Sequence, residues 1–314
     1  MADIKEAASN SPSDTTTSVL VQIVEHLDGT ITRPFIPLSP PSPNPPPVLS
    51  KDVVLNPTHR TSLRLYLPAA SGKLPILLFF HGGGFVLFNY SSTIYHICCE
   101  SMSLSLPALV VSLDYRLAPE HRLPAAYDDA VEALLWLRES NDPWITNHGD
   151  LSKVFLTGSS SGANIAYQVA VRSSKLHLPP LNLCGLVLNQ PYFGGVERTH
   201  SERELEGDSI LPLRANDTLW RLSLPKGVDR DHEFSNPVKA DGKVVKLPRC
   251  LVKGSKGDPL LDRQREFAKW LEEGGVEVVE KIDPEGFHAA ELFVENKAAE
   301  LFGEIREFVY ANDR

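Results

Sequence analysis

Three consecutive serines lie between glycines in the stretch LTGSSSGAN, residues 156–164. Only Ser160 has glycine two positions away on both sides, at Gly158 and Gly162, which gives the pattern G-x-S-x-G. This pattern is typical of a nucleophilic serine on a sharp turn between a strand and a helix, where the neighbouring residues have to be small. The pentapeptide is short, so its meaning depends on the rest of the chain.

A serine hydroxyl becomes a nucleophile when a base accepts its proton and an acid orients that base. The best base is His288 in EGFHAAELF, between the last expected strand and the last expected helix. The preferred acid is Asp258 in GSKGDPLLD, directly after another expected strand, and the chain order is then Ser, Asp, His. Asp262 and Asp283 remain alternatives, although Asp262 is placed to cap or pair with the following helix and Asp283 is only five residues before the histidine.

The sequence HGGGF at 81–85 directly follows an apolar run, and its glycines allow backbone N–H groups to approach a ligand. We expect the N–H groups of Gly83 and Gly84, together with that of Ser161, to bind a developing oxyanion. A phosphate-binding loop is a poorer interpretation because neither G-x-G-x-x-G nor G-K-[ST] is present. We expect His81 to shape this loop rather than to transfer protons.

Apolar side chains continue after these glycines in HGGGFVLFNYSS. We expect Phe85, Val86 and Leu87, with Phe88 and Tyr90 after them, to surround the apolar part of an uncharged substrate, because such side chains offer little to pair with a charge. The alternative is that several of them are buried in the core.

The elements that have to position these residues follow from the alternation of apolar runs and helical periods. Strands are expected at 63–67, 75–80, 108–115, 153–158, 184–190, 249–254 and 276–282, and helices at 125–140, 162–174, 262–275 and 294–310. This order predicts an α/β fold, with a mostly parallel sheet covered by helices on both faces. Ser160 then lies at the carboxyl edge of the sheet, where ligands bind in open α/β folds.

Three segments are expected to lie outside this alternation. Residues 1–18 are small and polar and are expected to be disordered. Residues 19–50 are expected to form a cap segment of two short strands and a proline-rich connector, which is either a linker or a flap across a pocket. Within the main domain, 51–314, the charged and irregular stretch at about 194–242 is expected to be an insertion over the carboxyl edge.

Composition excludes several other classes of protein. The 314 residues carry a formal net charge of -9, which argues against nucleic acid or an anionic membrane as the main partner. No apolar run approaches the roughly 18 residues of a membrane span, and the N-terminus has no secretory apolar region. The four cysteines form no C-x-x-C pair, and the adjacent Cys98 and Cys99 are expected to be apolar positions of a helix. We therefore expect no metal site and no disulfide, which fits a reducing cytoplasm.

The chain resembles a known family, the plant carboxylesterases of the hormone-sensitive-lipase-like group of α/β-hydrolases, to which the gibberellin receptors are related. The segments that carry the resemblance span about residue 20 to the C-terminus and are HGGGF, SLDYRLAPEHRLPAAYDDA, GSSSGANIA, GDPLLDRQ and GFHAAE. The resemblance implies an α/β-hydrolase fold, an N-terminal cap over the active site and no cofactor.

Residue by residue, the resemblance makes Ser160 the nucleophile, His288 the base and Asp258 the acid. It assigns the oxyanion hole to the amides of Gly83, Gly84 and Ser161, and structural roles to Arg116 and Glu120. One departure is Ser159, since the family usually has Asp or Glu before the nucleophile. The receptor branch lacks the histidine that this chain retains.

The expected function is a serine carboxylesterase, monomeric and cytoplasmic, that hydrolyses short-chain acyl esters of small alcohols or phenols through an acyl-enzyme. Two alternatives stay open. One is a small-molecule receptor in which the three catalytic groups are vestigial. The other is an acyltransferase or lactone-forming enzyme, in which an alcohol replaces water as the acceptor.

Overall fold

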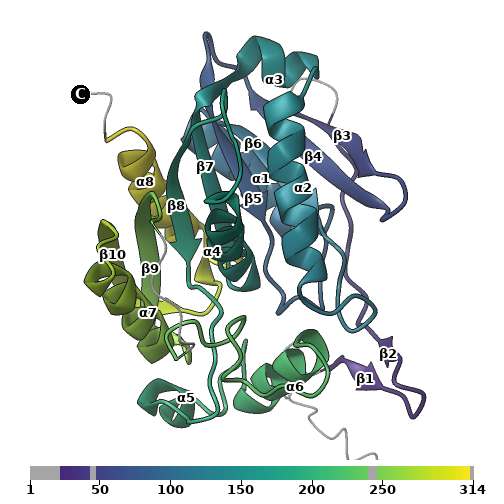
Figure 1. The fold of residues 1–314 in the computed structure, drawn as a ribbon, viewed down its shortest axis with the longest axis vertical. Helices are drawn as coiled ribbons and strands as arrows, with labels where there is room; N and C mark the ends of the chain where they lie inside the picture. Colours follow the sequence, from purple (N-terminus) through teal and green to yellow (C-terminus); the bar gives the residue numbers. More distant parts are fainter. Residues whose placement is uncertain (1–21, 43–46, 240–245, 312–314) are drawn as a thin grey trace, which may run out of the picture.

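The computed structural model describes residues 22–42, 47–239 and 246–311. Among these residues, eight strands form one sheet in the order β10-β9-β8-β7-β5-β6-β4-β3 (Figure 1). The strands are β3 (Val48–Asn56), β4 (Thr61–Pro68), β5 (Leu74–Phe80), β6 (Leu109–Asp114), β7 (Gly149–Ser159), β8 (Leu183–Asn189), β9 (Arg249–Gly257) and β10 (Val278–Phe287). Neighbouring strands in the series β10-β9-β8-β7-β5-β6 are parallel. The strands β4 and β3 continue the sheet in antiparallel pairing.

Helices cover both faces of the sheet, as the apolar runs predict. The helices are α1 (Thr93–Ser105), α2 (Ala125–Glu139), α3 (Pro143–His148), α4 (Ser161–Ser173), α5 (His200–Glu204), α6 (Leu213–Ser223), α7 (Leu261–Glu273) and α8 (Glu295–Val309). Residues of α2, α4, α6 and α7 belong to one core cluster, and residues of α1 and α8 belong to a second.

The central strand β5 shows why its sequence is apolar throughout. Leu74, Ile76 and Leu78 join the first core cluster, whereas Leu77 and Phe79 join the second. Alternate side chains of a strand point to opposite faces, so a strand that is covered on both faces needs apolar residues at every position. The continuous runs that predicted the inner strands have this cause.

Every strand and helix expected from the sequence is present, and the differences lie elsewhere. The edge strand β3 and the helix α3 were not expected, because polar residues interrupt their apolar patterns. Of α1, only Cys98 and Cys99 were expected to be helical, and both are buried positions of that helix. The interpretation of 194–242 as irregular is wrong in part. It contains α5, which begins with a capping box at Thr199 and Glu202, and the amphipathic helix α6.

The N-terminal segment packs beside this insertion. The strands β1 (Val24–Glu25) and β2 (Ile31–Thr32) form the expected hairpin, which lies near α6 in Figure 1. The Arg221 guanidinium of α6 donates to Glu25 at 2.8 Å. Arg33 donates to the carbonyl oxygens of Val86 and Ala118 at 2.7 and 2.8 Å.

Glu120 also pairs with Arg33, which agrees with the structural role that the resemblance gives it. Three segments lie outside the described residues: residues 1–18, which were predicted to be disordered, part of the proline-rich connector, and the end of the insertion. None of the helices in the described ranges is long and apolar enough to cross a membrane.

Candidate active site

The turn that carries Ser160 is a strained junction between β7 and α4. Ser160 has φ 56° and ψ -121°, a backbone conformation that residues other than glycine rarely adopt. The flanking glycines are needed because a Cβ on Gly158 would lie 2.3 Å from the carbonyl carbon of Gly162. A Cβ on Gly162 would lie 1.9 Å from the backbone oxygen of Phe80. The tight turn places the Ser160 hydroxyl at the carboxyl edge of the sheet.

Ser160, His288 and Asp258 form a continuous hydrogen-bonded chain. The Ser160 Oγ lies 3.0 Å from the His288 Nε2, and the His288 Nδ1 lies 3.0 Å from the Asp258 Oδ2. Asp258 and His288 directly follow β9 and β10, whose carboxyl ends meet at the same edge of the sheet as the end of β7. All three side chains are buried. The geometry permits proton transfer from the serine to the imidazole.

The Asp258 carboxylate is fixed by two further donors. The Gln264 Nε2 donates to its Oδ2 at 2.8 Å, and the Leu260 N–H donates to its Oδ1 at 2.9 Å. The two alternative acids lie in other contacts. Asp262 accepts a hydrogen bond from the Ser201 N–H at 2.8 Å, and Asp283 pairs with Lys297 at 2.9 Å.

Charges around His288 favour its protonated form. Burial alone would lower the pKa of His288, but the charge and hydrogen bond of Asp258 raise it. The carboxylates of Glu291 and Asp208 act in the same direction, so the pKa of His288 is raised above its ordinary value. An imidazolium that forms when His288 accepts a proton is therefore stabilised.

The backbone N–H groups expected to bind an oxyanion lie beside Ser160. Gly83 and Gly84 have φ of 107° and 61°, and a Cβ on Gly83 would lie 2.4 Å from the backbone oxygen of Leu87. Among the backbone hydrogen bonds of the described loops and turns, none uses the N–H of Gly83 or Gly84. The N–H of Ser161 is at the first position of α4, where helix N–H groups have no acceptor within the helix. These donors can therefore bind a ligand oxygen.

His81 is fully buried and stacks on Tyr115, with ring centroids 4.2 Å apart. Its Nδ1 lies 2.8 Å from the backbone oxygen of Gly82, and burial lowers the pKa of His81 to about 4. A neutral, buried ring in these contacts shapes the loop, as expected.

Comparisons with known proteins extend this geometry. A family model described as "alpha/beta hydrolase fold" matches residues 77–292. "Probable carboxylesterase 8" of Arabidopsis thaliana is 45% identical over 307 residues, which cover 92% of each chain. "3-O-acetylpapaveroxine carboxylesterase CXE2" of Papaver somniferum is 44% identical over 90% of this chain and 95% of its own. The chain belongs to the carboxylesterase family of α/β-hydrolases.

More distant members of this group have other functions or origins. "Gibberellin receptor GID1" of Oryza sativa is 40% identical over 78% of this chain and 69% of its own. A solved structure, the hyperthermophilic esterase from Pyrobaculum calidifontis, superimposes with a TM-score of 0.74 at 28% identity, over 83% of this chain and 85% of its own. The protein is thus a carboxylic ester hydrolase of the α/β-hydrolase fold.

The esterase has a small apolar cavity of about 50 Å³ that reaches Ser160 and His288. Its described lining contains no lysine, arginine, aspartate or glutamate and comes from the glycine loop, from α1, from the segment 192–219 and from the turn after His288. Phe88, Tyr95 and Leu219 are among these residues. The contributions of Tyr95 and Leu219 were missed because the spacing of apolar residues in α1 and in the insertion does not indicate which of them face Ser160.

The expected substrate contacts of Phe85, Val86 and Leu87 need correction. These side chains are at most 1% exposed, belong to the core and do not line the cavity. The ring of Phe85 packs against Trp220, with centroids 5.7 Å apart, instead of facing Ser160. Of the apolar residues in this loop, Phe88 lines the cavity.

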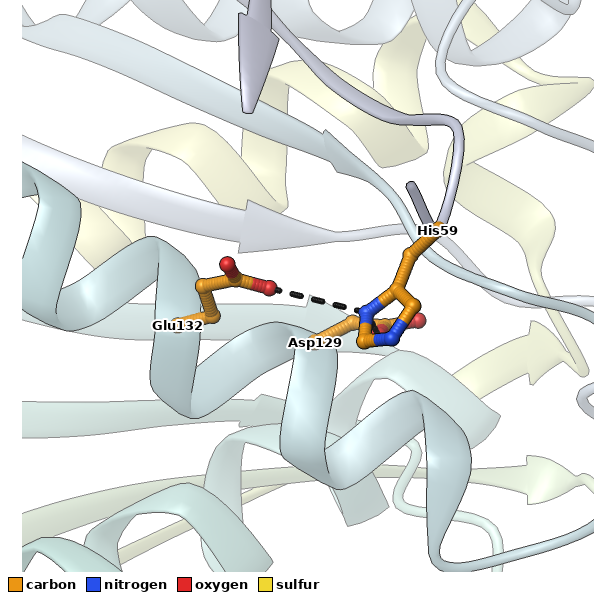
Figure 2. Close-up of side chains that lie close together, drawn as sticks. All are labelled: His59, Asp129 and Glu132. Atoms are coloured by element: carbon orange, nitrogen blue, oxygen red, sulfur yellow. Dashed lines mark ion pairs between the residues drawn. The ribbon is translucent and has the colours of Figure 1, made fainter. Parts of the chain in front are cut away.

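One group of side chains among the described residues has spacing that could suit a metal ion. His59, in the turn after β3, faces Asp129 and Glu132 of α2, with its Nδ1 3.8 and 3.9 Å from their carboxylate oxygens (Figure 2). Both Asp129 oxygens already accept hydrogen bonds from Arg116, which gives Arg116 its expected structural role. A cation would have to approach beside the Arg116 guanidinium, so we assign this group to the stability of the fold.

Proposed function

We propose that this carboxylesterase hydrolyses uncharged, short-chain acyl esters of small alcohols or phenols, with Ser160 as nucleophile, His288 as general base and Asp258 as the acid that orients it. The observation that carries the proposal is the Ser160–His288–Asp258 chain, with both contacts at 3.0 Å, on a strained turn beside free backbone donors. The metal-free chemistry of such a chain needs no cofactor.

The reaction has two halves. In the first half, the Ser160 Oγ attacks the ester carbonyl carbon while its proton passes to the His288 Nε2. The resulting oxyanion binds to the N–H groups of Gly83, Gly84 and Ser161. His288 then gives the proton to the departing alcohol, which leaves an acyl-enzyme.

In the second half, a water molecule takes the place of the alcohol. His288 accepts a proton from this water as its oxygen attacks the acyl carbonyl carbon. Collapse of the second tetrahedral intermediate returns the proton to the Ser160 Oγ and releases the carboxylic acid. Throughout, Asp258 holds the Nδ1–H of His288, so that Nε2 remains free to accept a proton.

The cavity supports the choice of a short acyl group. A water molecule needs roughly 10–15 Å³ of such volume, so a cavity of about 50 Å³ holds only a few non-hydrogen atoms. Its uncharged lining favours an uncharged substrate. The poppy relative is named for an acetylated substrate, which is consistent with a small acyl group.

We further propose that residues 194–242 and the N-terminal segment 19–50 act as the cap of this site. Ile210, Leu211 and Leu219 of the insertion line the cavity, which supports the first part. The contacts of Arg33 and Arg221 described above support the second. We also propose a monomer in a reducing cytoplasm, where its four free thiols are stable.

The test is turnover of p-nitrophenyl acetate by the full chain and by Ser160→Ala. We expect steady turnover of the wild type, near-complete loss in Ser160→Ala, and labelling of Ser160 by a p-nitrophenyl alkylphosphonate. Binding of the ester without turnover would favour a receptor with a vestigial site. Acyl transfer to an added alcohol in preference to water would favour the transferase reading.

A further inference from the structure

Besides Asp258, a second carboxylate, that of Glu291, contacts the turn that carries Ser160. Glu291 belongs to the short helix η2 (Ala290–Leu292), three residues after His288. Its Oε1 accepts a hydrogen bond from the Ser159 Oγ at 2.6 Å and another from the Asn189 Nδ2 at 2.9 Å. The Asn189 Nδ2 also donates to the Ser159 Oγ at 3.0 Å, which closes a three-membered network.

This network connects three parts of the site that are far apart in the sequence. Ser159 is the last residue of β7, Asn189 is the last residue of β8, and Glu291 follows β10 and His288. The backbone contributes to the same junction, because the Ser160 N–H donates to the Asn189 oxygen at 2.9 Å. The network therefore fixes the turn after the base relative to the turn that carries the nucleophile.

Within residues 22–42, 47–239 and 246–311, no ion pair of Glu291 with a lysine, arginine or histidine is found. Glu291 itself is half-buried, and its two donors are neutral and at most 5% exposed. After burial, its charge is the next cause that raises the pKa of Tyr95, and it also acts on Cys98 and His288.

We propose that Glu291 is a positioning residue of the esterase: its carboxylate ties the turn carrying His288 to the nucleophile turn and places a negative charge beside the imidazole. This inference rests on the proposed roles of Ser160 and His288. The charged groups that act on His288 are Asp258 from the end of β9, Glu291 from η2 and Asp208 from the insertion. Of these three carboxylates, Glu291 is the one bonded to Ser159.

Glu291→Gln separates charge from position, because its amide oxygen can still accept both hydrogen bonds. His288 has to be neutral to accept a proton, so activity falls as the pH drops through its pKa. Glu291 raises that pKa. We therefore expect the acidic limb of kcat/KM in Glu291→Gln to move to lower pH, with a plateau reduced by less than about threefold.

Glu291→Ala removes the tie as well, and we expect its plateau kcat to fall by roughly tenfold or more, since misplaced reacting groups are costly. The matched control is Glu295→Gln, which makes the same charge change on an exposed residue four positions later. We expect its limb and plateau to match those of the wild type. An unmoved limb in Glu291→Gln, or an equal shift in Glu295→Gln, would overturn the electrostatic part.

The hydrogen bond between Ser159 and Glu291 is tested by moving the carboxylate from position 291 to position 159. Ser159→Asp places a second carboxylate against Glu291, and like charges in contact repel strongly. We expect kcat/KM of Ser159→Asp to fall more than tenfold and the double variant Ser159→Asp/Glu291→Gln to recover to within about threefold of Glu291→Gln. Additive losses in the double variant would overturn the tie.

Ser159→Asp, Glu291→Gln and the double variant also test this inference independently of the proposed function. Thermal unfolding of these three variants reports the contact without any substrate. If the wild type hydrolysed no ester, the proposed function would fail. A Tm lowered by Ser159→Asp and restored in the double variant would still support the tie, and equal Tm values in all variants would refute it.

Discussion

Asp258→Asn is the sharpest test of the site, because it changes one oxygen to nitrogen without changing the shape of the side chain. The carboxylate accepts hydrogen bonds from the Leu260 N–H on Oδ1 and from Gln264 and His288 on Oδ2. An asparagine that keeps its oxygen on the Leu260 N–H turns its NH₂ group toward His288. The His288 Nδ1 then accepts a hydrogen bond instead of donating one.

This change of tautomer places the imidazole proton on Nε2, which faces the Ser160 Oγ at 3.0 Å. A protonated Nε2 cannot accept the serine proton, so we expect kcat to fall by about 10³ to 10⁴-fold. That loss corresponds to about 4 to 5.4 kcal/mol of activation free energy at 1.36 kcal/mol for each factor of ten. KM should change little, since Asp258 does not line the cavity.

The assay is steady-state hydrolysis of p-nitrophenyl acetate from pH 5 to 9, with thermal unfolding to check the fold. The matched control is Asp262→Asn, the same substitution four residues later. Asp262 accepts from the Ser201 N–H and makes no contact with His288. We expect its kcat to stay within about twofold and its stability to fall by about 1 kcal/mol. A mild effect of Asp258→Asn together with a large loss in Asp262→Asn would refute the choice of acid.

The remaining predictions concern the nucleophile turn and the cavity. Ser160→Ala should lose nearly all ester turnover because the Ser160 hydroxyl faces His288, whereas Ser161→Ala should keep most of it and Ser159→Ala, in which Asn189 still holds Glu291, should lose far less than Ser160→Ala; a larger loss in Ser159→Ala than in Ser160→Ala would contradict the assignment. Acetate and butyrate p-nitrophenyl esters should be hydrolysed well and palmitate hardly at all, as kcat/KM over the series will show, and a maximum at long chains would indicate a lipase. Gly162→Ala should lower the free energy of unfolding in urea by about 3 kcal/mol or more, because its Cβ would lie 1.9 Å from the Phe80 oxygen, and native stability would contradict the packing.

The sequence by itself determined the fold class and the order of the chemical groups. Inner strands such as β5 are apolar at every position because both of their faces are covered, and that pattern is visible without any structure. The glycines around Ser160 can also be recognised in the sequence, because a turn this tight excludes a Cβ at Gly158 and Gly162. His288 and Asp258 could be proposed because each follows a strand, and the carboxyl ends of parallel strands meet at one edge.

Tertiary structure decided where each side chain points. Asp258, Asp262 and Asp283 are all acids near the expected edge, and only strand register and side-chain direction bring Asp258 to His288. The buried position of Phe85 depends on a positive φ of 65° and on packing against Trp220. Neither feature follows from the local pattern of apolar residues.

The contact between Ser159 and Glu291 joins residues 132 positions apart. Local sequence patterns follow the geometry of single strands and helices, whose side chains repeat every 2 or about 3.6 residues. A hydrogen bond across the ends of separate strands depends instead on how those strands are ordered in the sheet. The carboxylate under the nucleophile turn could therefore be located only once β7, β8 and β10 had been brought to the same edge.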